Sequence, residues 1–290
     1  MHLTDKTAVV TGGGSGLGMG LCMALARRGN AVVVADIEEE AAHRTAAEVA
    51  ALGVESLAFV CDVSDHDAVG VLADTAWSRF GSVEILCNNA GVSLGGRLVE
   101  ARPEDFDWVF GVNVKGMLNG SQVFGSRFAA TDANCFIVNT ASEHSLGVPH
   151  VGAGLYTASK HAVMGLTDVL RREMPHNVQV SLACPGIVSS RIHDATRNRP
   201  SGLGGPGEPN RLAQAVLAMG MDPLEAGEHV VVGVEDGEYM IFTHSHSREY
   251  ADERYREISQ AFERQAPRVP GDERYKVANL VREARATAEP

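Results

Sequence analysis

The chain has 290 residues, 44% of them hydrophobic, which is enough for one large domain or two small ones with a sizeable core. Its formal net charge of −12, with no basic cluster, argues against nucleic-acid and membrane partners, although backbone N–H groups can still bind a phosphate locally. No signal peptide is visible, and no apolar run reaches the roughly 20 residues that span a bilayer, so we expect a cytoplasmic protein.

The five cysteines are spaced too widely for a Cys-x-x-Cys site, and several lie in apolar runs that are typical of strands. We therefore expect buried free thiols, as in a protein of a reducing compartment. They are Cys22, Cys61, Cys87, Cys135 and Cys184.

Short apolar runs alternate with helical patterns over the first two thirds of the chain. The runs are continuously apolar, which is typical of strands buried on both faces of a parallel sheet. We expect strands over Thr7–Thr11, Ala31–Ala35, Ser56–Cys61, Ile85–Asn88, Cys135–Asn139, Val178–Cys184 and Glu238–His244. We expect helices over Gly16–Arg28, Glu38–Leu52, Asp65–Phe80, Pro103–Ala129, Tyr156–Met174 and from Asp222 onward. The predicted fold is α/β, a Rossmann-type doubly wound parallel sheet with helices on both faces.

A glycine-rich string, Thr-Gly-Gly-Gly-Ser-Gly-Leu-Gly, runs from Thr11 to Gly18 between the first predicted strand and the first predicted helix. Such a string alone also fits an ordinary turn, but strand–turn–helix is the context that a dinucleotide site requires. The glycines allow positive φ and a close approach of the backbone to a pyrophosphate, which the helix N-terminus then faces. We predict cofactor contacts from Gly12, Ser15, Gly16, Leu17 and Gly18.

Asp36 ends the second predicted strand. A carboxylate at this place can accept hydrogen bonds from both adenosine ribose hydroxyls, and it repels a 2′-phosphate. The loop offers Ser15 and Ile37, and we expect no Arg or Lys nearby to hold such a phosphate, so we predict NAD(H) over NADP(H). The alternative is that Asp36 only ends a strand or caps a helix.

Tyr156 and Lys160 are four residues apart and therefore share one helix face. A free tyrosine titrates near 10, and a neighbouring ammonium would lower that pKa toward the range of a useful base. Ser142 follows the fifth predicted strand and could hydrogen-bond a substrate oxygen whose charge changes. The Tyr-x-x-x-Lys pattern alone is common on helix surfaces; it indicates catalysis here because the glycine-rich string, Asp36 and Ser142 accompany it.

These residues resemble the short-chain dehydrogenase/reductase superfamily, in its compact single-domain branch. The resemblance covers about residues 5–190 and the strand near 240. Several motifs occur in the family's order: Thr11–Gly18, Asp62-Val63, Asn88-Asn-Ala-Gly91, Asn113, Ser142, Tyr156/Lys160 and Pro185-Gly186. The larger epimerase-like branch has a glycine where this chain has Ser15, so that branch is set aside.

The resemblance implies cofactor contacts beyond the glycine-rich string. Asp62 and Val63 would contact adenine, Pro185-Gly186-Ile187 would approach the nicotinamide amide, and Ser190 stands where the family often has Thr. Asn89, Ala90 and Gly91 would line the cofactor. Two residues of the reaction centre, Tyr156 and Lys160, would also contact it.

The resemblance also implies a reaction centre of Asn113, Ser142, Tyr156 and Lys160. Tyr156 would exchange a proton with the substrate oxygen while a hydride moves to or from the nicotinamide. The main-chain carbonyl of Asn113 would hold a water that continues the proton path from Lys160. Gly111 and Gly116 flank Asn113, which predicts a local distortion of that helix.

Three weaker features of the sequence remain. The interval from Ser142 to Tyr156 is one residue longer than is typical of the family, and Glu143 and His144 would lie either in the substrate pocket or on the surface. His244-Ser-His246 has a spacing that could suit a metal, but no third ligand is evident, so we predict no metal site.

The last third of the chain changes in composition. Arg191–Asn210 is rich in Gly and Pro and predicts a loop or lid, within a segment Ile187–Met221 that would cover the substrate. From Ser245 the chain is charged and helix-prone, with a break at Pro267–Gly271. We expect one dinucleotide-binding and catalytic domain over 1–244 and a helical C-terminal extension over 245–290.

The combined prediction is an NAD-dependent oxidoreductase that interconverts a secondary alcohol and a ketone. The tail is similar to that of bacterial members that oxidise bulky substrates, which implies an aromatic, terpenoid or steroid-like small molecule. The family also implies a homodimer or a homotetramer built on helices 103–129 and 156–174. Two alternatives stay open: an NADPH-dependent biosynthetic ketoreductase, and a non-catalytic NAD-binding regulator.

Overall fold

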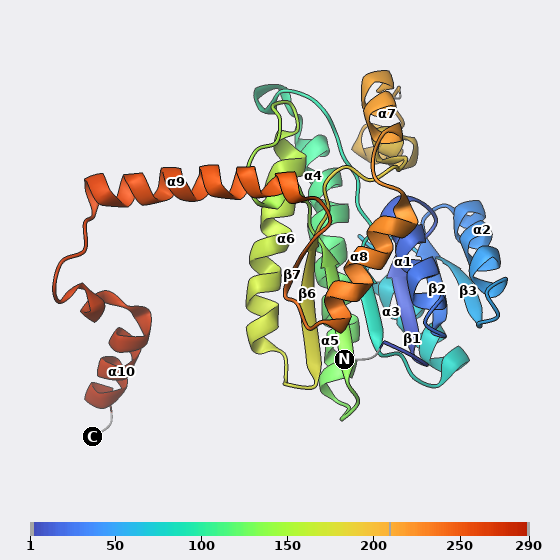
Figure 1. Ribbon diagram of the computed structural model, residues 1–290, viewed down its shortest axis with the longest axis horizontal. Helices are drawn as coiled ribbons and strands as arrows, with labels where there is room; N and C mark the ends of the chain where they lie inside the picture. The colour runs from blue at the N-terminus through green and yellow to red at the C-terminus, as the bar shows by residue number, and fades with distance from the viewer. Residues whose placement is uncertain (1–2, 209, 289–290) are drawn as a thin grey trace. The chain divides into compact units, whose positions relative to one another are not determined.

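The structure is a computed structural model that describes residues 3–208 and 210–288 (Figure 1). The chain divides into two compact units, Met1–Tyr250 and Ala251–Pro290. The first unit contains the strands β1 (Thr7–Thr11), β2 (Ala31–Asp36), β3 (Ser56–Val60), β4 (Ile85–Asn88), β5 (Cys135–Thr140), β6 (Val178–Cys184) and β7 (Met240–Phe242). They form one parallel sheet in the order β3-β2-β1-β4-β5-β6-β7.

The helices alternate with these strands along the chain and confirm the predicted doubly wound α/β fold. They are α1 (Gly16–Ala26), α2 (Glu39–Ala50), α3 (His66–Phe80), α4 (Pro103–Phe110), α5 (Gly116–Ala129), α6 (Gly154–Glu173), α7 (Arg211–Ala218), α8 (Pro223–Glu235), α9 (Arg248–Gln265) and α10 (Val277–Ala288).

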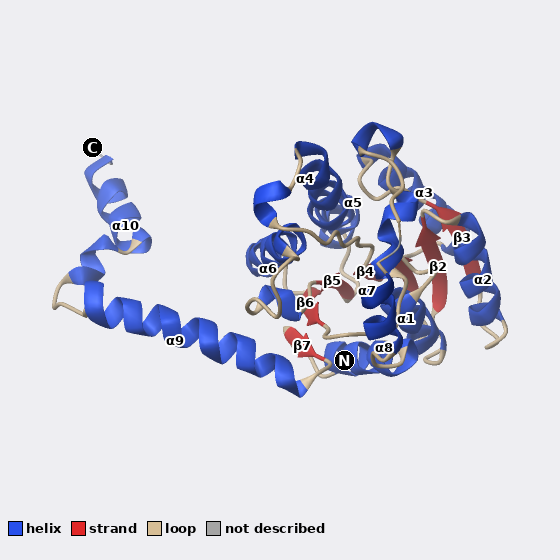
Figure 2. Cartoon of the chain, turned by 90° about the horizontal axis from the view of Figure 1, so that it is seen from above, coloured by secondary structure: helices blue, strands red, loops and turns tan. Residues whose placement is uncertain are grey.

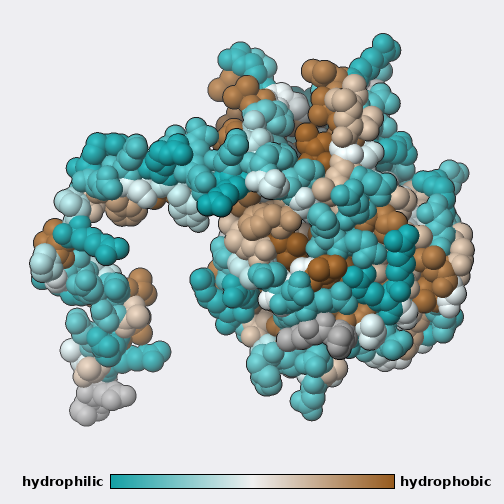
Figure 3. All heavy atoms as spheres, in the orientation of Figure 1, coloured by the Kyte–Doolittle hydropathy of each residue, from teal (hydrophilic) through white to brown (hydrophobic). Residues whose placement is uncertain are grey.

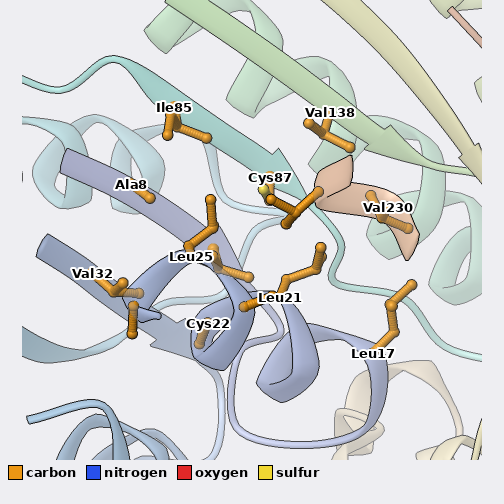
Figure 4. Close-up of a cluster of buried hydrophobic side chains, with 14 of the residues drawn as sticks. Ala8, Leu17, Leu21, Cys22, Leu25, Val32, Ile85, Cys87, Val138 and Val230 are labelled. Carbon is orange, nitrogen blue, oxygen red and sulfur yellow. The ribbon is translucent and has the colours of Figure 1, made fainter. Parts of the chain in front are cut away.

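The sheet is buried on both faces because helices cover each of them (Figure 2). In β1, Ala8 and Val10 belong to a core cluster with residues of α1 and α8, some of which Figure 4 shows. Val9, between them, belongs to the cluster on the other face, with residues of α3 and α5. Since successive side chains of a strand point to opposite faces, burial on both sides demands the uninterrupted apolar runs seen in the sequence.

The predicted helix 103–129 is helical throughout but is not one regular α-helix. A π-helical turn, Gly111–Lys115, separates α4 from α5, and the N–H of Gly116 bonds to the carbonyl of Gly111, five residues back. A Cβ on Gly116 would lie 2.6 Å from Val63 Cγ2, so this stretch packs directly against the segment after β3. The predicted distortion around Asn113 is confirmed.

One prediction for the last third of the chain needs correction, and one helix was not predicted. The last strand is Met240–Phe242, shorter than predicted, because β7 lies at the sheet edge and the carbonyl of Glu238 instead accepts a hydrogen bond from Ser181 Oγ. The segment predicted as a loop is followed by a helix, α7, which Asn210 caps through a hydrogen bond from the N–H of Ala213.

The helix predicted from Asp222 is α8, and the Asp222 carboxylate accepts hydrogen bonds from the N–H groups of Leu224 and Glu225. The second unit holds most of α9 and all of α10, with the predicted break between them. Over the described residues, no helix is both long and apolar enough to cross a membrane. The five cysteines are buried free thiols, as predicted.

The contact between α1 and α8 depends on glycine. A Cβ built on Gly20 of α1 would overlap the carbonyl oxygen of Pro223, and one on Gly227 of α8 would overlap the backbone of Gly20. The two helix backbones therefore meet without side chains between them, which holds the start of α8 against the helix that follows the glycine-rich string.

We expect Gly20→Ala to lower the free energy of unfolding by about 1–3 kcal/mol, because the added methyl forces the two helices apart. The matched control is Gly70→Ala in α3, where an added Cβ meets no atom within 4 Å. The control should leave stability unchanged or raise it by about 0.5–1 kcal/mol through helix propensity. Urea unfolding checks both; equal midpoints for the two variants would contradict the close packing.

Candidate active site

The predicted site residues come together at one cleft of about 990 Å³, beyond the carboxyl ends of the strands. This is where ligands bind in open parallel sheets. Many of the residues predicted to contact the cofactor line this cleft, namely Gly12, Ser15, Gly16, Leu17, Gly18, Asp36, Asp62, Val63, Asn89, Ala90, Gly91, Pro185, Gly186, Ile187 and Ser190. Three residues of the predicted reaction centre also line the cleft, namely Ser142, Tyr156 and Lys160. The fourth, Asn113, lies behind the cleft wall.

The glycine-rich turn is bound tightly to the end of β4. Gly12 has φ +64° and Gly16 has φ +53°, the left-handed region that favours glycine. The Asn89 side-chain amide donates to the carbonyls of Thr11 (3.1 Å) and Gly12 (3.3 Å), and a Cβ on Gly18 would overlap that Gly12 carbonyl. The start of α1 therefore lines the cleft and packs closely against Asn89 and Ser190, and a helix N-terminus placed there can bind a phosphate.

The far end of the cleft is more basic than the sequence indicated. The Asp36 carboxylate accepts hydrogen bonds from the N–H groups of Gly14 (2.9 Å) and Glu38 (3.0 Å). Three arginines, Arg44, Arg191 and Arg197, line the same cleft. The expectation that no Arg or Lys lies near Asp36 is therefore wrong, because the fold brings these residues in from α2 and from the segment after β6.

Tyr156 and Lys160 lie in the first two turns of α6, and Ser142 lies just after β5. The Lys160 ammonium is 5.6 Å from the centre of the Tyr156 ring, and its Nζ donates to the carbonyl of Thr140 at 2.9 Å. The Ser142 hydroxyl lies near the Tyr156 phenol and favours its phenolate form. Ser142 and Lys160 are buried, and Tyr156 is half-buried toward the cleft.

The protein alone does not lower the pKa of Tyr156, contrary to the prediction. Burial raises this pKa to about 12, and the charge of Glu143 raises it further, while the nearby Ser142 hydroxyl acts in the opposite sense. Burial also lowers the pKa of Lys160 to about 8. The Lys160 ammonium does not offset the effect of burial on the Tyr156 pKa, because it bonds to a carbonyl and not to the phenol oxygen.

Asn113 is almost fully buried in the π-helical turn, where its side chain holds the neighbouring wall. Its Oδ1 accepts from the N–H of Val92 (2.8 Å), and its Nδ2 donates to the Val92 carbonyl (2.9 Å) and to Ser159 Oγ (2.9 Å). A Cβ on Gly91 would lie 3.4 Å from Asn113 Oδ1 and 3.5 Å from Lys160 Nζ. Asn113 thus supports the wall behind Lys160; the water held by its carbonyl stays a prediction.

Glu143 and His144 are buried and line the cleft, which resolves the alternative left open by the sequence. They form a 3₁₀ turn with Ser145 that accommodates the longer interval before Tyr156. His144 Nδ1 lies 2.7 Å from Thr157 Oγ1, and its ring stands edge-on to Tyr156 at 5.2 Å. Burial lowers the pKa of His144 to about 4, so this ring is neutral at physiological pH.

The strand β7 leads directly to a further residue at the site, which sequence reasoning missed in this role. His246 Nε2 lies 3.0 Å from Glu143 Oε2, so the segment after β7 holds the residue that follows Ser142. The only feature of the sequence that singles out His246 is the His-x-His spacing, which could also suit a metal. Among the residues that the structure describes, no three His, Cys, Asp or Glu side chains are grouped for a metal ion.

Comparison with known proteins agrees with this arrangement. Residues 6–201 match the family model "short chain dehydrogenase". The chain is 31% identical over 261 residues to a C alpha-dehydrogenase of Sphingobium, covering 88% of this chain and 85% of the relative. It is 38% identical over 212 residues to a 1-deoxy-11-beta-hydroxypentalenate dehydrogenase of Streptomyces arenae, covering 71% and 74%.

A solved structure extends the likeness to nearly the whole chain. A short-chain dehydrogenase/reductase from Burkholderia phymatum, in complex with NAD, superposes with a TM-score of 0.85 at 35% identity, covering 93% of this chain and 99% of that one. The family model, the relatives and the geometry of the cleft therefore agree, and the chain belongs to the short-chain dehydrogenase/reductase superfamily of oxidoreductases.

Proposed function

We propose that this protein is an NAD-dependent dehydrogenase that interconverts a bulky, apolar secondary alcohol and its ketone. The observation that carries the proposal is that Ser142, Tyr156 and Lys160 share one cleft with the glycine-rich turn and with Asp36. The Asp36 carboxylate favours a free ribose 2′-hydroxyl over a 2′-phosphate. The NAD complex of the Burkholderia protein supports the same choice of cofactor.

The glycine-rich turn and α1 would hold the pyrophosphate, and the residues after β6 would hold the nicotinamide end. When bound, the nicotinamide supplies the hydride acceptor or donor. In oxidation the Tyr156 phenolate would take the proton of the substrate hydroxyl, and in reduction the phenol would return it. The Ser142 hydroxyl, which lies near that phenol, would orient the substrate oxygen beside it.

Lys160 would supply the positive charge that this proton transfer needs. Its pKa of about 8, lowered by burial, leaves it mostly an ammonium at neutral pH. Burial raises the pKa of Tyr156 to about 12 in the protein alone, so forming phenolate requires more positive charge near the ring than Lys160 provides. We propose that the oxidised cofactor adds that charge, so that the base becomes active only in the loaded cleft.

The substrate end of the cleft has apolar walls. Leu212 and Val216 of α7 are exposed and line the cleft, as do Leu94 and Val151. Figure 3 shows apolar atoms gathered on the projections at the top of the view, one of which is α7. Because burying apolar surface yields affinity in proportion to area, such walls favour a bulky substrate over a small alcohol.

Two other functions are alternatives for this cleft. The arginines near Asp36 favour the first, an NADPH-dependent ketoreductase, because guanidinium groups bind phosphate well. The second is a non-catalytic NAD-binding regulator, and the complete set of reaction-centre residues opposes it.

We also propose self-association through the helices α4 to α6. Large apolar side chains are exposed on these helices, namely Phe106, Leu118, Leu166 and Val169. An exposed apolar group of this kind is typical of an interface between subunits.

Steady-state turnover tests the proposed function. A panel of aryl, terpenoid and small secondary alcohols is offered with NAD or NADP, and formation of the reduced cofactor is followed by absorbance. We expect kcat/KM with NAD and a bulky alcohol to exceed that with NADP or with 2-propanol. Equal use of NADP would support the ketoreductase, and tight NAD binding with no turnover across the panel would support the regulator.

We expect Tyr156→Phe to reduce kcat by at least about a hundredfold, since it removes the proton-transferring group, while NAD binding measured by calorimetry is retained. The control is Tyr255→Phe in the exposed part of α9, which should leave turnover unchanged. Turnover near that of the original protein in Tyr156→Phe would refute the role of the phenol.

The raised pKa of Tyr156 predicts a titration that depends on cofactor. In ligand-free protein, the phenolate absorbance of the original protein minus that of Tyr156→Phe should show no step below about pH 10, the ordinary value for tyrosine. Saturating NAD should move the step to lower pH, because the nicotinamide ring of the oxidised cofactor would place a positive charge near the phenol. A step near neutral pH without cofactor would show that Lys160 alone activates the phenol.

A further inference from the structure

The arginines beside Asp36 come from two parts of the fold. Arg44 belongs to α2, whereas Arg191 and Arg197 belong to the irregular segment that follows β6. Arg44 and Arg191 also line a second, shallower depression next to Gly14 and Ser15. The end of the cleft that would receive the adenosine ribose thus carries guanidinium groups, which suit a phosphate dianion.

The Glu38 carboxylate accepts hydrogen bonds from two of these guanidinium groups. Its Oε1 accepts hydrogen bonds from Arg197 Nε at 2.5 Å and from Asn198 Nδ2 at 2.7 Å, and its Oε2 accepts from Arg191 Nη1 at 3.4 Å. Its N–H is the donor that binds Asp36 Oδ1. One residue therefore joins the ribose-binding turn to the segment after β6.

The contacts between Glu38 and Arg197 are partly shielded from water. The side chains of Glu38 and Arg197 are each 23% exposed, while that of Arg191 is 51% exposed. Arg197 is also fixed by donating from Nη1 to the carbonyls of Arg191 and Asp194. Burial alone would raise the pKa of Glu38, but hydrogen bonds from Asn198 and Arg197 outweigh it, so this pKa is lowered and the carboxylate stays charged.

We propose that Glu38 is a second specificity-determining residue for the cofactor, because it binds Arg191 and Arg197 and so keeps them from a ribose 2′-phosphate. Asp36 acts differently: both of its oxygens accept backbone hydrogen bonds from the turn, and it excludes the phosphate by repulsion alone. This inference rests on the NAD preference in the proposed function, and it locates a separate part of that preference in Glu38.

The test uses ligand binding and needs no turnover. Calorimetry measures the affinity of the full-length protein for adenosine 2′,5′-bisphosphate and for 5′-AMP, and the ratio of the two isolates the 2′-phosphate. We expect Glu38→Gln to raise this ratio about tenfold, the effect of one charge-assisted hydrogen bond. Glu40→Gln, which changes the charge equally at an exposed position of α2 outside the cleft, should change it by less than about twofold.

A second pair of variants tests whether the arginines carry the effect. Replacing Arg191 and Arg197 by Gln should hardly change the ratio while Glu38 is present, because both are already occupied. In the Glu38→Gln background the same replacement should remove the gain. An unchanged ratio in Glu38→Gln, or a gain that survives loss of both arginines, would overturn the inference.

The experiment separates this inference from the proposed function. The ratio for the original protein tests the cofactor preference: if it favours the bisphosphate, the NAD assignment fails. The change in ratio on substituting Glu38 tests the inference, and its absence in a protein that prefers 5′-AMP would refute the role of Glu38 alone.

Discussion

The buried Lys160 ammonium is the interaction on which the reaction centre depends. An ammonium removed from water is unfavourable unless it is hydrogen-bonded, and here only 3% of the residue is exposed and Nζ donates to the Thr140 carbonyl. That bond attaches α6 to the end of β5, and so places Tyr156, one turn earlier, beside Ser142. Gly91 lies beside the ammonium, and Asn113 supports that wall through Val92.

Sequence predicted the sheet and the composition of the cleft well, because both follow from local patterns. A strand buried on both faces must be apolar throughout, and the residues after parallel strands meet at one edge, where Ser142 and Gly91 both line the cleft. The guanidinium groups at Asp36 were missed because Arg197 pairs with a residue 159 positions away. The direction of the Tyr156 pKa was missed because it depends on burial and on the orientation of Lys160.

The two ends of the cleft use polar groups in different ways. Around Asp36, arginine and carboxylate side chains form a network of ion pairs that is partly open to water. Around Tyr156, burial suppresses charge: the phenol is protonated, and the His144 ring beside it is neutral. Glu143 is the exception, a buried carboxylate held by His246. A substrate thus meets apolar walls, a neutral imidazole and one anion, while the cofactor would meet an ionic surface.

The burial of the cysteines has a consequence for handling the protein. Burial raises the pKa of Cys61, Cys87 and Cys184 to about 12 and that of Cys135 to about 11, so almost no thiolate exists near neutral pH. Because the thiolate is the reactive form, alkylating reagents can attack Cys87, Cys135 and Cys184, which do not line the cleft, only when the fold opens. The rate at which such a reagent modifies the native protein is therefore a direct readout of how often the sheet and its covering helices separate.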